Sequence, residues 1–121
     1  MSISVHTAFY EGRDASEPGI VVQVTVLHGS YMIWAGTSAV SEEDKEKAIL
    51  TGHLGRDWAC GMPPTENGNS TGTVLLRSSG SDAALSMACR LAKRLRSQVF
   101  VALDVESRLV MLAERRIIAS L

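Results

Sequence analysis

The chain has 121 residues, of which 45% are hydrophobic and 21% are charged, and its formal net charge is −1. This length and composition suit one folded domain over residues 1–121 with a real core, and they exclude a disordered tail. The near-neutral charge gives no general reason to expect nucleic acid or an anionic membrane as the partner.

Alternating apolar residues predict strands in the first part of the chain. Ser2–Tyr10 has a strand pattern, and Ile20–Leu27 is the clearest strand of all. The pair Gly29-Ser30 fits a two-residue turn with glycine at its first central position, and Tyr31–Ala35 is the expected return strand. The two segments therefore predict a hairpin.

The next part of the chain begins with a charged excursion, Ser38–Gly55, which has room for a short exposed helical turn. Arg56–Met62 and Thr73–Arg77 are expected strands, because both are apolar runs bounded by turn residues. Between them, Thr65–Gly72 has the composition of a flexible loop.

The last part predicts two helices on either side of a strand. A helix is expected over Asp82–Ser97 and a strand over Gln98–Leu103. Ser107–Leu121 is the expected closing helix, although Leu109–Leu112 also fits a hairpin strand. The apolar side of this closing helix would carry Leu109, Leu112, Ala113, Ile117 and Leu121. Six strands with two late helices predict an α+β fold with a mainly antiparallel sheet and both helices on one face.

The helix over Asp82–Ser97 has one apolar and one basic face. Its apolar stripe consists of Leu85, Ala88, Ala92 and Leu95, flanked by Ala84 and Leu91. Ser79 or Ser81 is the expected cap, with Asp82 favourable at the positive end of the helix dipole. The basic residues Arg90, Lys93, Arg94 and Arg96 have two interpretations: compensation of the helix dipole, or a patch of Arg90, Lys93 and Arg94 that binds an acidic protein partner.

The face of the sheet opposite the helices is expected to pack against a second chain. In the strand Gln98–Leu103, apolar residues point both ways, and two helices can cover only one face. A large apolar surface usually marks an interface, so we expect a second sheet to stack on it at about 10 Å. With the predicted turn, the side facing the partner chain consists of Val21, Gln23, Thr25, Leu27, Met32 and Trp34. The side under the helices consists of Val22, Val24, Val26, Ile33 and Ala35.

Several segments, taken in order, resemble one known family. They are RLAKRLRSQVFVALDV (Arg90–Val105), YMIWAG (Tyr31–Gly36), the SSGSDAALSMA helix start and LVMLAERRI (Leu109–Ile117). This combination resembles proteasome assembly chaperone 4 from about Gly19 onward. The excursion Ser38–Gly55 is longer and more charged than in that family, and the link Asp104–Arg108 is shorter.

The resemblance implies a non-catalytic α+β chaperone without a cofactor. It implies pairing with an assembly chaperone 3-like chain, or with a second copy, and action on the α subunits of the proteasome core-particle ring. The two-faced sheet agrees with such a pair.

The residues offer few alternatives to a binding protein. No serine-hydrolase, phosphate-loop, dinucleotide or zinc-protease motif occurs. The Ser78–Asp82 turn before a helix keeps one alternative open, a small anion- or nucleotide-binding enzyme. Cys60 and Cys89 lack metal or disulfide spacing and are expected to be buried thiols, and no metal site is expected.

We expect a cytoplasmic protein, with the nucleus as a second compartment. No apolar run approaches the roughly 20 residues that a bilayer-spanning helix needs. Residues 1–14 lack the basic segment and the continuous apolar stretch of a secretion signal.

Overall fold

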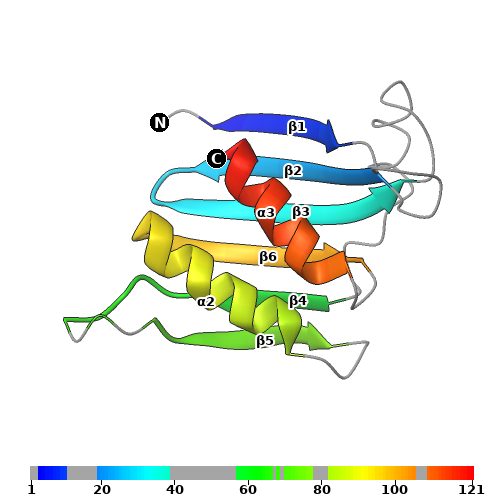
Figure 1. Cartoon of the computed structure of the whole chain (residues 1–121). Helices are drawn as coiled ribbons and strands as arrows, with labels where there is room; N and C mark the ends of the chain where they lie inside the picture. The colour runs from blue at the N-terminus through cyan, green and yellow to red at the C-terminus, as the bar shows by residue number, and fades with distance from the viewer. Residues whose placement is uncertain are drawn as a thin grey trace.

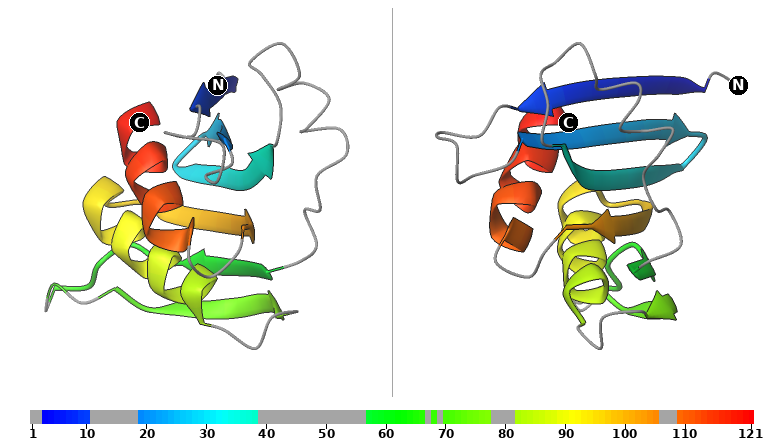
Figure 2. Two further views of the ribbon diagram at one scale, coloured as in Figure 1. Left: turned by 45° about the vertical axis from the view of Figure 1, so that its right-hand side comes forward. Right: turned by 90° about the vertical axis from the view of Figure 1, so that its right-hand side faces the viewer.

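A computed structural model describes residues 3–10, 19–38, 57–66, 68, 70–77, 82–105 and 109–121. In this part of the chain, six strands form one sheet and two helices lie on one face of it (Figures 1 and 2). The strands are β1 (Ser4–Tyr10), β2 (Gly19–Leu27), β3 (Ser30–Ser38), β4 (Asp57–Gly61), β5 (Gly72–Arg77) and β6 (Gln98–Asp104). The helices are α2 (Ala83–Leu95) and α3 (Val110–Ser120). The predicted α+β fold is confirmed.

The strand order is β1-β2-β3-β6-β4-β5. All neighbours are antiparallel except β3 and β6, which run parallel at the centre of the sheet. Since β4 is antiparallel to both β5 and β6, the latter two point the same way, and α2 makes the crossover between them. Parallel strands need such a long connection, which explains why a helix stands between β5 and β6.

The hairpin between β2 and β3 turns one residue earlier than the sequence predicts. Its turn residues are His28 and Gly29, and Leu27 pairs with Ser30. Gly29 has a φ of 77°, so it occupies the second central position, where a type II turn requires a left-handed residue. The expected turn at Gly29-Ser30 is therefore wrong. The pairing shifts by two residues, which preserves the assignment of side chains to faces.

Helix α2 is rotated relative to the predicted stripe. Its buried residues are Ala84, Met87, Ala88, Leu91 and Ala92, which follow the 3.6-residue helical period. Leu85 and Leu95 lie at the flanks and are only partly buried, and Met87 was missed. A Cβ at Gly61 would lie 2.6 Å from the carbonyl carbon of Ala88, so this glycine lets the helix approach β4 closely. That approach fixes Ala88 at the centre of the helix face.

Helix α3 replaces the alternative strand over Leu109–Leu112. Leu109 is its N-cap, and Leu109, Ala113 and Ile117 are buried against the sheet. Leu121, which was expected on the apolar side, is exposed. Together the two helices cover one continuous core with the inward residues of β2, β3 and β6. Neither of these helices, nor any other helix of the described residues, is long and apolar enough to cross a membrane.

Three expectations concern residues outside the described ranges. The helical turn within the Ser38–Gly55 excursion is one of them, since only Ser38, the last residue of β3, is described there. The others are the capping roles of Ser79 and Ser81. The N-cap of α2 is Asp82, and its side chain makes no capping hydrogen bond.

Candidate partner-binding face

The sheet has one face that neither helix covers, which we call the helix-free face. Strand register determines its members, because paired residues point to the same side. In the three strands β1 to β3 these include Val5, Thr7, Phe9, Val21, Gln23, Thr25, Leu27, Ser30, Met32, Trp34 and Gly36. In the strands on the other side of β3 they include Gln98, Phe100, Ala102, Asp104, Trp58, Cys60, Thr73 and Leu76.

All six residues of the predicted interface lie on this helix-free face. Gln23 pairs with Trp34, and Thr25 pairs with Met32. The expected helix-side set also lies where it was placed, because Val22, Val24, Ile33 and Ala35 are buried in the core under the helices and Val26 packs against it. The separation of faces is correct, although the cross-strand partners differ by two positions.

One end of the helix-free face has a small core of its own. Val21, Trp34 and Ala102 are buried there, with Phe9 and Trp58 packed against them. Trp34 is only 3% exposed. Its indole ring lies over Gly36, since a Cβ at that position would be 2.6 Å from Cη2 of Trp34. Val21 and Trp34 are thus already buried within the single chain.

Two polar groups in this small core lack an acceptor. The indole Nε1 atoms of Trp34 and Trp58 are both buried and have no hydrogen-bond partner. A buried donor without an acceptor typically costs about 1–3 kcal/mol. Both belong to residues of the helix-free face, so this face holds two buried donors that find no acceptor among the described residues.

The rest of the helix-free face is more open and mixes apolar residues with the neutral polar residues Thr7, Gln23 and Thr25. Leu27, Met32 and Phe100 are partly buried, and Val5 on the edge strand β1 is 55% exposed. Leu76, on the opposite edge strand β5, is exposed as well. Exposed apolar residues that share one face of a sheet are typical of an interaction surface.

The predicted basic patch is divided between two roles. Arg90 binds Glu114 of α3: its Nε donates to Oε2 at 2.9 Å and to Oε1 at 3.2 Å, and Nη2 also contacts Oε1. The hydrogen bond to Glu114 raises the pKa of Arg90, and burial opposes this rise only in part. Lys93 and Arg94 are exposed on α2. Arg90 therefore joins the two helices, while Lys93 and Arg94 face solvent.

The two cysteines are free thiols and differ in burial. Cys60 is buried, Cys89 is partly buried, and both are free thiols. Gln98 Nε2 lies 3.5 Å from Cys60 Sγ. His6 and His28 are exposed on β1 and in the hairpin turn. In the part of the chain that the structure describes, no three metal-binding side chains gather.

One sequence candidate falls largely outside this part. The Ser78–Asp82 turn is not among the described residues, apart from Asp82 itself. The alternative of an anion- or nucleotide-binding enzyme therefore gains no geometric support.

The comparisons with known proteins agree with this architecture. The family model of proteasome assembly chaperone 4 matches residues 19–105. The chain belongs to the proteasome assembly chaperone 4 family. No curated protein sequence matches it. The match to the family model runs from the start of β2 to the end of the strand that follows α2, so it includes most of the helix-free face.

A solved structure shares the fold. It is a chain from a yeast structure described as a novel chaperone complex for 20S proteasome assembly, with a TM-score of 0.65 and 17% sequence identity. The match covers 98% of this chain and 90% of that chain. Near-complete coverage on both sides shows that the sheet with its two helices is the shared unit.

Proposed function

We propose that this chain is a non-catalytic chaperone for assembly of the proteasome core particle, and that it works as one half of a pair. The other half is an assembly chaperone 3-like chain or a second copy. The family match supports the chaperone role, and the structural neighbour is itself a chain of a chaperone complex. The clients in this proposal are α subunits of the core-particle ring.

The helix-free face is the surface that we assign to pairing. Both helices lie on the opposite side, and the apolar residues Leu27, Met32 and Phe100 remain partly exposed. A partner sheet at about 10 Å would remove them from water.

The burial of individual residues decides which of them we propose as contacts of the partner chain. Trp34 and Val21 are buried without a partner, so they support the face from inside rather than anchor the other chain. Met32 and Leu27, with Thr25 and Gln23 beside them, are the proposed contact residues. Met32 lies in the central strands of the sheet, where hot spots of an interface usually concentrate.

The test is co-purification with a tagged chain, in the native sequence and in two variants. Met32→Asp places a charge on the helix-free face, while Met111→Asp makes the same change on α3, where Met111 is 73% exposed. We expect the native chain and Met111→Asp to recover a related small chain together with α subunits. Met32→Asp should lose the related chain, because an unpaired carboxylate would be buried between the sheets.

Circular dichroism of each purified variant completes the experiment. If Met32→Asp folds normally and still recovers the related chain, the assignment of the face is wrong. If the native chain recovers neither α subunits nor a related chain, and instead binds a phosphate ligand saturably, the chaperone proposal fails in favour of the enzyme alternative.

A further inference from the structure

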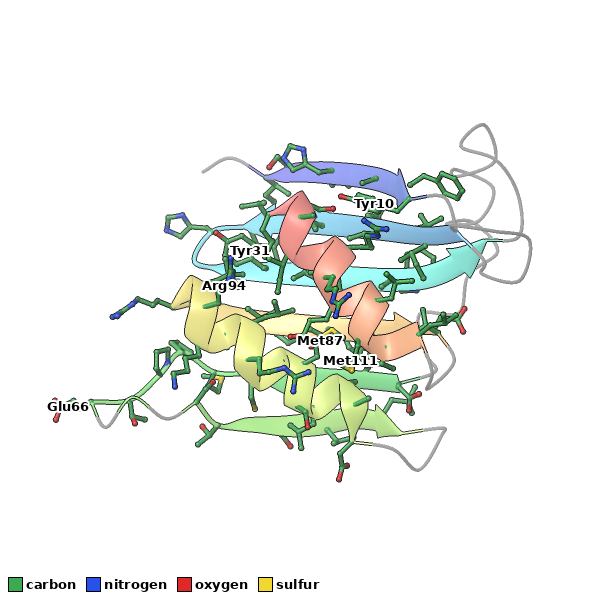
Figure 3. The ribbon with its side chains drawn as sticks, in the orientation of Figure 1. Tyr10, Tyr31, Glu66, Met87, Arg94 and Met111 are labelled. Carbon is green, nitrogen blue, oxygen red and sulfur yellow. The ribbon has the colours of Figure 1, made fainter. Side chains whose placement is uncertain are left out.

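Strand β1 is the first strand in the order of the sheet, and β2 is its one strand partner among the described residues. All 7 residues of β1 pair with β2, from Ser4 opposite Val26 to Tyr10 opposite Ile20, without a register shift. Figure 1 shows β1 at the margin of the sheet, and Figure 3 shows the same strand with Tyr10 at its end. The outward N–H and C=O groups of an edge strand are a template for pairing with another strand.

The two edge strands of the sheet differ in how they resist such pairing. Natural edge strands are protected by charged residues, by proline or by a bulge. On the opposite edge, β5 has a register shift against β4 between Trp58 and Ala59, which bends the strand. The sequence of β1, SVHTAFY, contains no Asp, Glu, Lys, Arg or proline. Of the two edge strands, β1 is thus the regular one without a protective feature.

The start of β1 also exposes apolar side chains. Ile3, just before the strand, is 59% exposed, and Val5 is 55% exposed. Thr7 and Phe9 lie on the same face as Val5 and are partly buried. A regular edge strand with exposed apolar side chains is typical of sites where a further strand is added to a sheet. These features together indicate that β1 accepts another strand.

The sequence of β1 is complementary to itself. Opposite residues of a continuous sheet point to the same side, so odd-numbered residues of one copy must meet odd-numbered residues of the other. Antiparallel pairing centred on Thr7 meets this condition and pairs all 7 residues, whereas a centre at His6 or Ala8 pairs only residues 4–8 or 6–10. The centre at Thr7 places Thr7 opposite Thr7, and Val5 opposite Phe9 on both sides of the axis.

The pairs that this register creates are favourable. Thr with Thr, and a β-branched residue with an aromatic one, are among the cross-strand pairs that stabilise sheets. On the helix side, Ser4 lies opposite Tyr10 and His6 lies opposite Ala8, so this register brings no two like charges together. A centre at His6 would instead place two imidazole rings opposite each other. The side chains therefore favour the same register as the length of the strand.

We propose that β1 pairs with β1 of a second copy of this chain, antiparallel and centred on Thr7. The two sheets then form one continuous sheet, with all helices on one side and two helix-free faces side by side on the other. The contact uses the edge of the sheet, so it does not depend on which chain covers the helix-free face. A strand of 7 residues is small beside the roughly 20–30 residues per side of a standard interface, so the association is weak and reversible.

Cysteine crosslinking tests both the pairing and its register. In Thr7→Cys the two new thiols lie directly opposite each other, at the Cα separation of about 4.4–6.8 Å that a disulfide requires. In the control, Val5→Cys, each new thiol faces Phe9 of the other copy, and the two thiols lie roughly 13 Å apart along the strands. With oxidised glutathione, Thr7→Cys should give about fivefold more disulfide-linked dimer than Val5→Cys on a non-reducing gel. Random collisions would give the opposite order, because Val5 is 55% exposed and Thr7 is partly buried.

Two further samples separate the edge contact from other contacts. The native chain on the same gel measures crosslinking through Cys60 and Cys89, and this background is subtracted. Thr7→Cys combined with Met32→Asp should crosslink as well as Thr7→Cys alone, because Met32 lies on β3 rather than on the edge strand. Stacked sheets lie about 10 Å apart, which is too far for a disulfide between their strands. Loss of the crosslink in the combined variant would place the contact on the helix-free face and overturn the proposal.

Charge pairing tests the same axis without a thiol, in chains that also carry Met32→Asp so that stacking does not contribute. Thr7→Lys and Thr7→Glu each bring like charges together and should weaken self-association in analytical ultracentrifugation by about tenfold. An equimolar mixture of the two places lysine opposite glutamate and should restore the association. A mixture that associates no better than its components would overturn the proposal, and so would equal crosslinking of Thr7→Cys and Val5→Cys. Recovery of the related chain depends on the helix-free face, so the two proposals can fail separately.

Discussion

Gly36→Ala tests whether the helix-free face is built as described. Gly36 is buried in the central strand β3, and no left-handed φ restricts it. Alanine is normally preferred over glycine inside a strand by about 0.5–1 kcal/mol. Here the added Cβ would lie 2.6 Å from Cη2 of Trp34, a separation that is too short for two carbon atoms. The indole would have to leave its position over residue 36.

We expect Gly36→Ala to lower the free energy of unfolding by about 1–3 kcal/mol, which is typical of an overpacked core. For a chain of this size, the melting temperature should fall by roughly 4 °C for each kcal/mol. Trp34→Ala alone should cost more, about 3–5 kcal/mol, because it empties the small core beside Val21 and Ala102. Urea denaturation followed by circular dichroism measures all three proteins on one scale.

The double variant gives the sharpest result. Once Trp34 is alanine, Gly36→Ala has no ring to displace and should become neutral or stabilising by about 0.5–1 kcal/mol. The sign of the effect of Gly36→Ala therefore reverses between the two backgrounds. If Gly36→Ala destabilises the chain equally in both, Trp34 does not lie over Gly36, and the description of the helix-free face is refuted.

Four further substitutions test the helix side. Leu91→Ala should lower the free energy of unfolding by about 2–5 kcal/mol, because Leu91 is only 1% exposed. Leu85→Ala should lower it clearly less, because Leu85 lies at the flank of the helix face. Equal losses of the two variants in urea denaturation would mean that the rotation of α2 is wrong. Glu114→Gln should cost no more than about 1 kcal/mol, since the side chain of Arg90 is 54% exposed, and added salt should shrink the difference from the native chain. Because the pKa of Arg90 is raised, the stabilisation from its ion pair with Glu114 is complete below the ordinary pKa of arginine and is lost only as the pH rises through the higher pKa of the folded state. The difference in unfolding free energy between the native chain and Glu114→Gln should therefore be the same at pH 7 and pH 9, and a change between these two values would contradict the ion pair. Tyr10→Phe removes the hydroxyl bonded to Ser120 and should cost about 0.5–1.5 kcal/mol with faster amide exchange at the end of α3; unchanged exchange there would show that the bond does not hold the helix.

The alternation of apolar residues is sufficient to predict which side chains of the central hairpin share a face. The alternation of Ile20–Leu27 predicts its two sides, and an error in the turn shifted the pairing by two residues, which leaves side chains on the same face. The turn itself was misplaced because glycine fits either central position of a tight turn. The register shows which one it takes, because Leu27 pairs with Ser30 and leaves Gly29 as the second turn residue.

Contacts between distant segments could not be predicted. The rotation of α2 depends on the approach of Ala88 to Gly61, two residues that are far apart in the chain. The salt bridge from Arg90 to Glu114 likewise joins two helices, so the basic patch appeared from sequence alone as one surface. The parallel pairing of β3 and β6 has the same cause, since nothing local indicates that the last strand enters between β3 and β4.

The sequence predicts which face of the sheet carries the proposed contact residues, but not how deeply each of them is buried. Periodicity assigns Trp34 to the side away from the helices, and the structure agrees. It cannot show that Phe9 and Trp58 pack around it, because these come from an edge strand and from the far side of the sheet. We therefore propose Met32, two positions earlier, as a contact residue in place of Trp34.

Hydroxyl-radical footprinting of the methionines tests the pairing face most directly. The isolated chain is compared with the purified complex that it forms with its related chain, and oxidation of each methionine is followed by mass spectrometry. Met32 on the helix-free face should lose most of its reactivity in the complex, while Met111, 73% exposed on α3, should remain fully reactive. Protection of Met111 with unchanged oxidation of Met32 would place the partner on the helix side and contradict the proposed pairing.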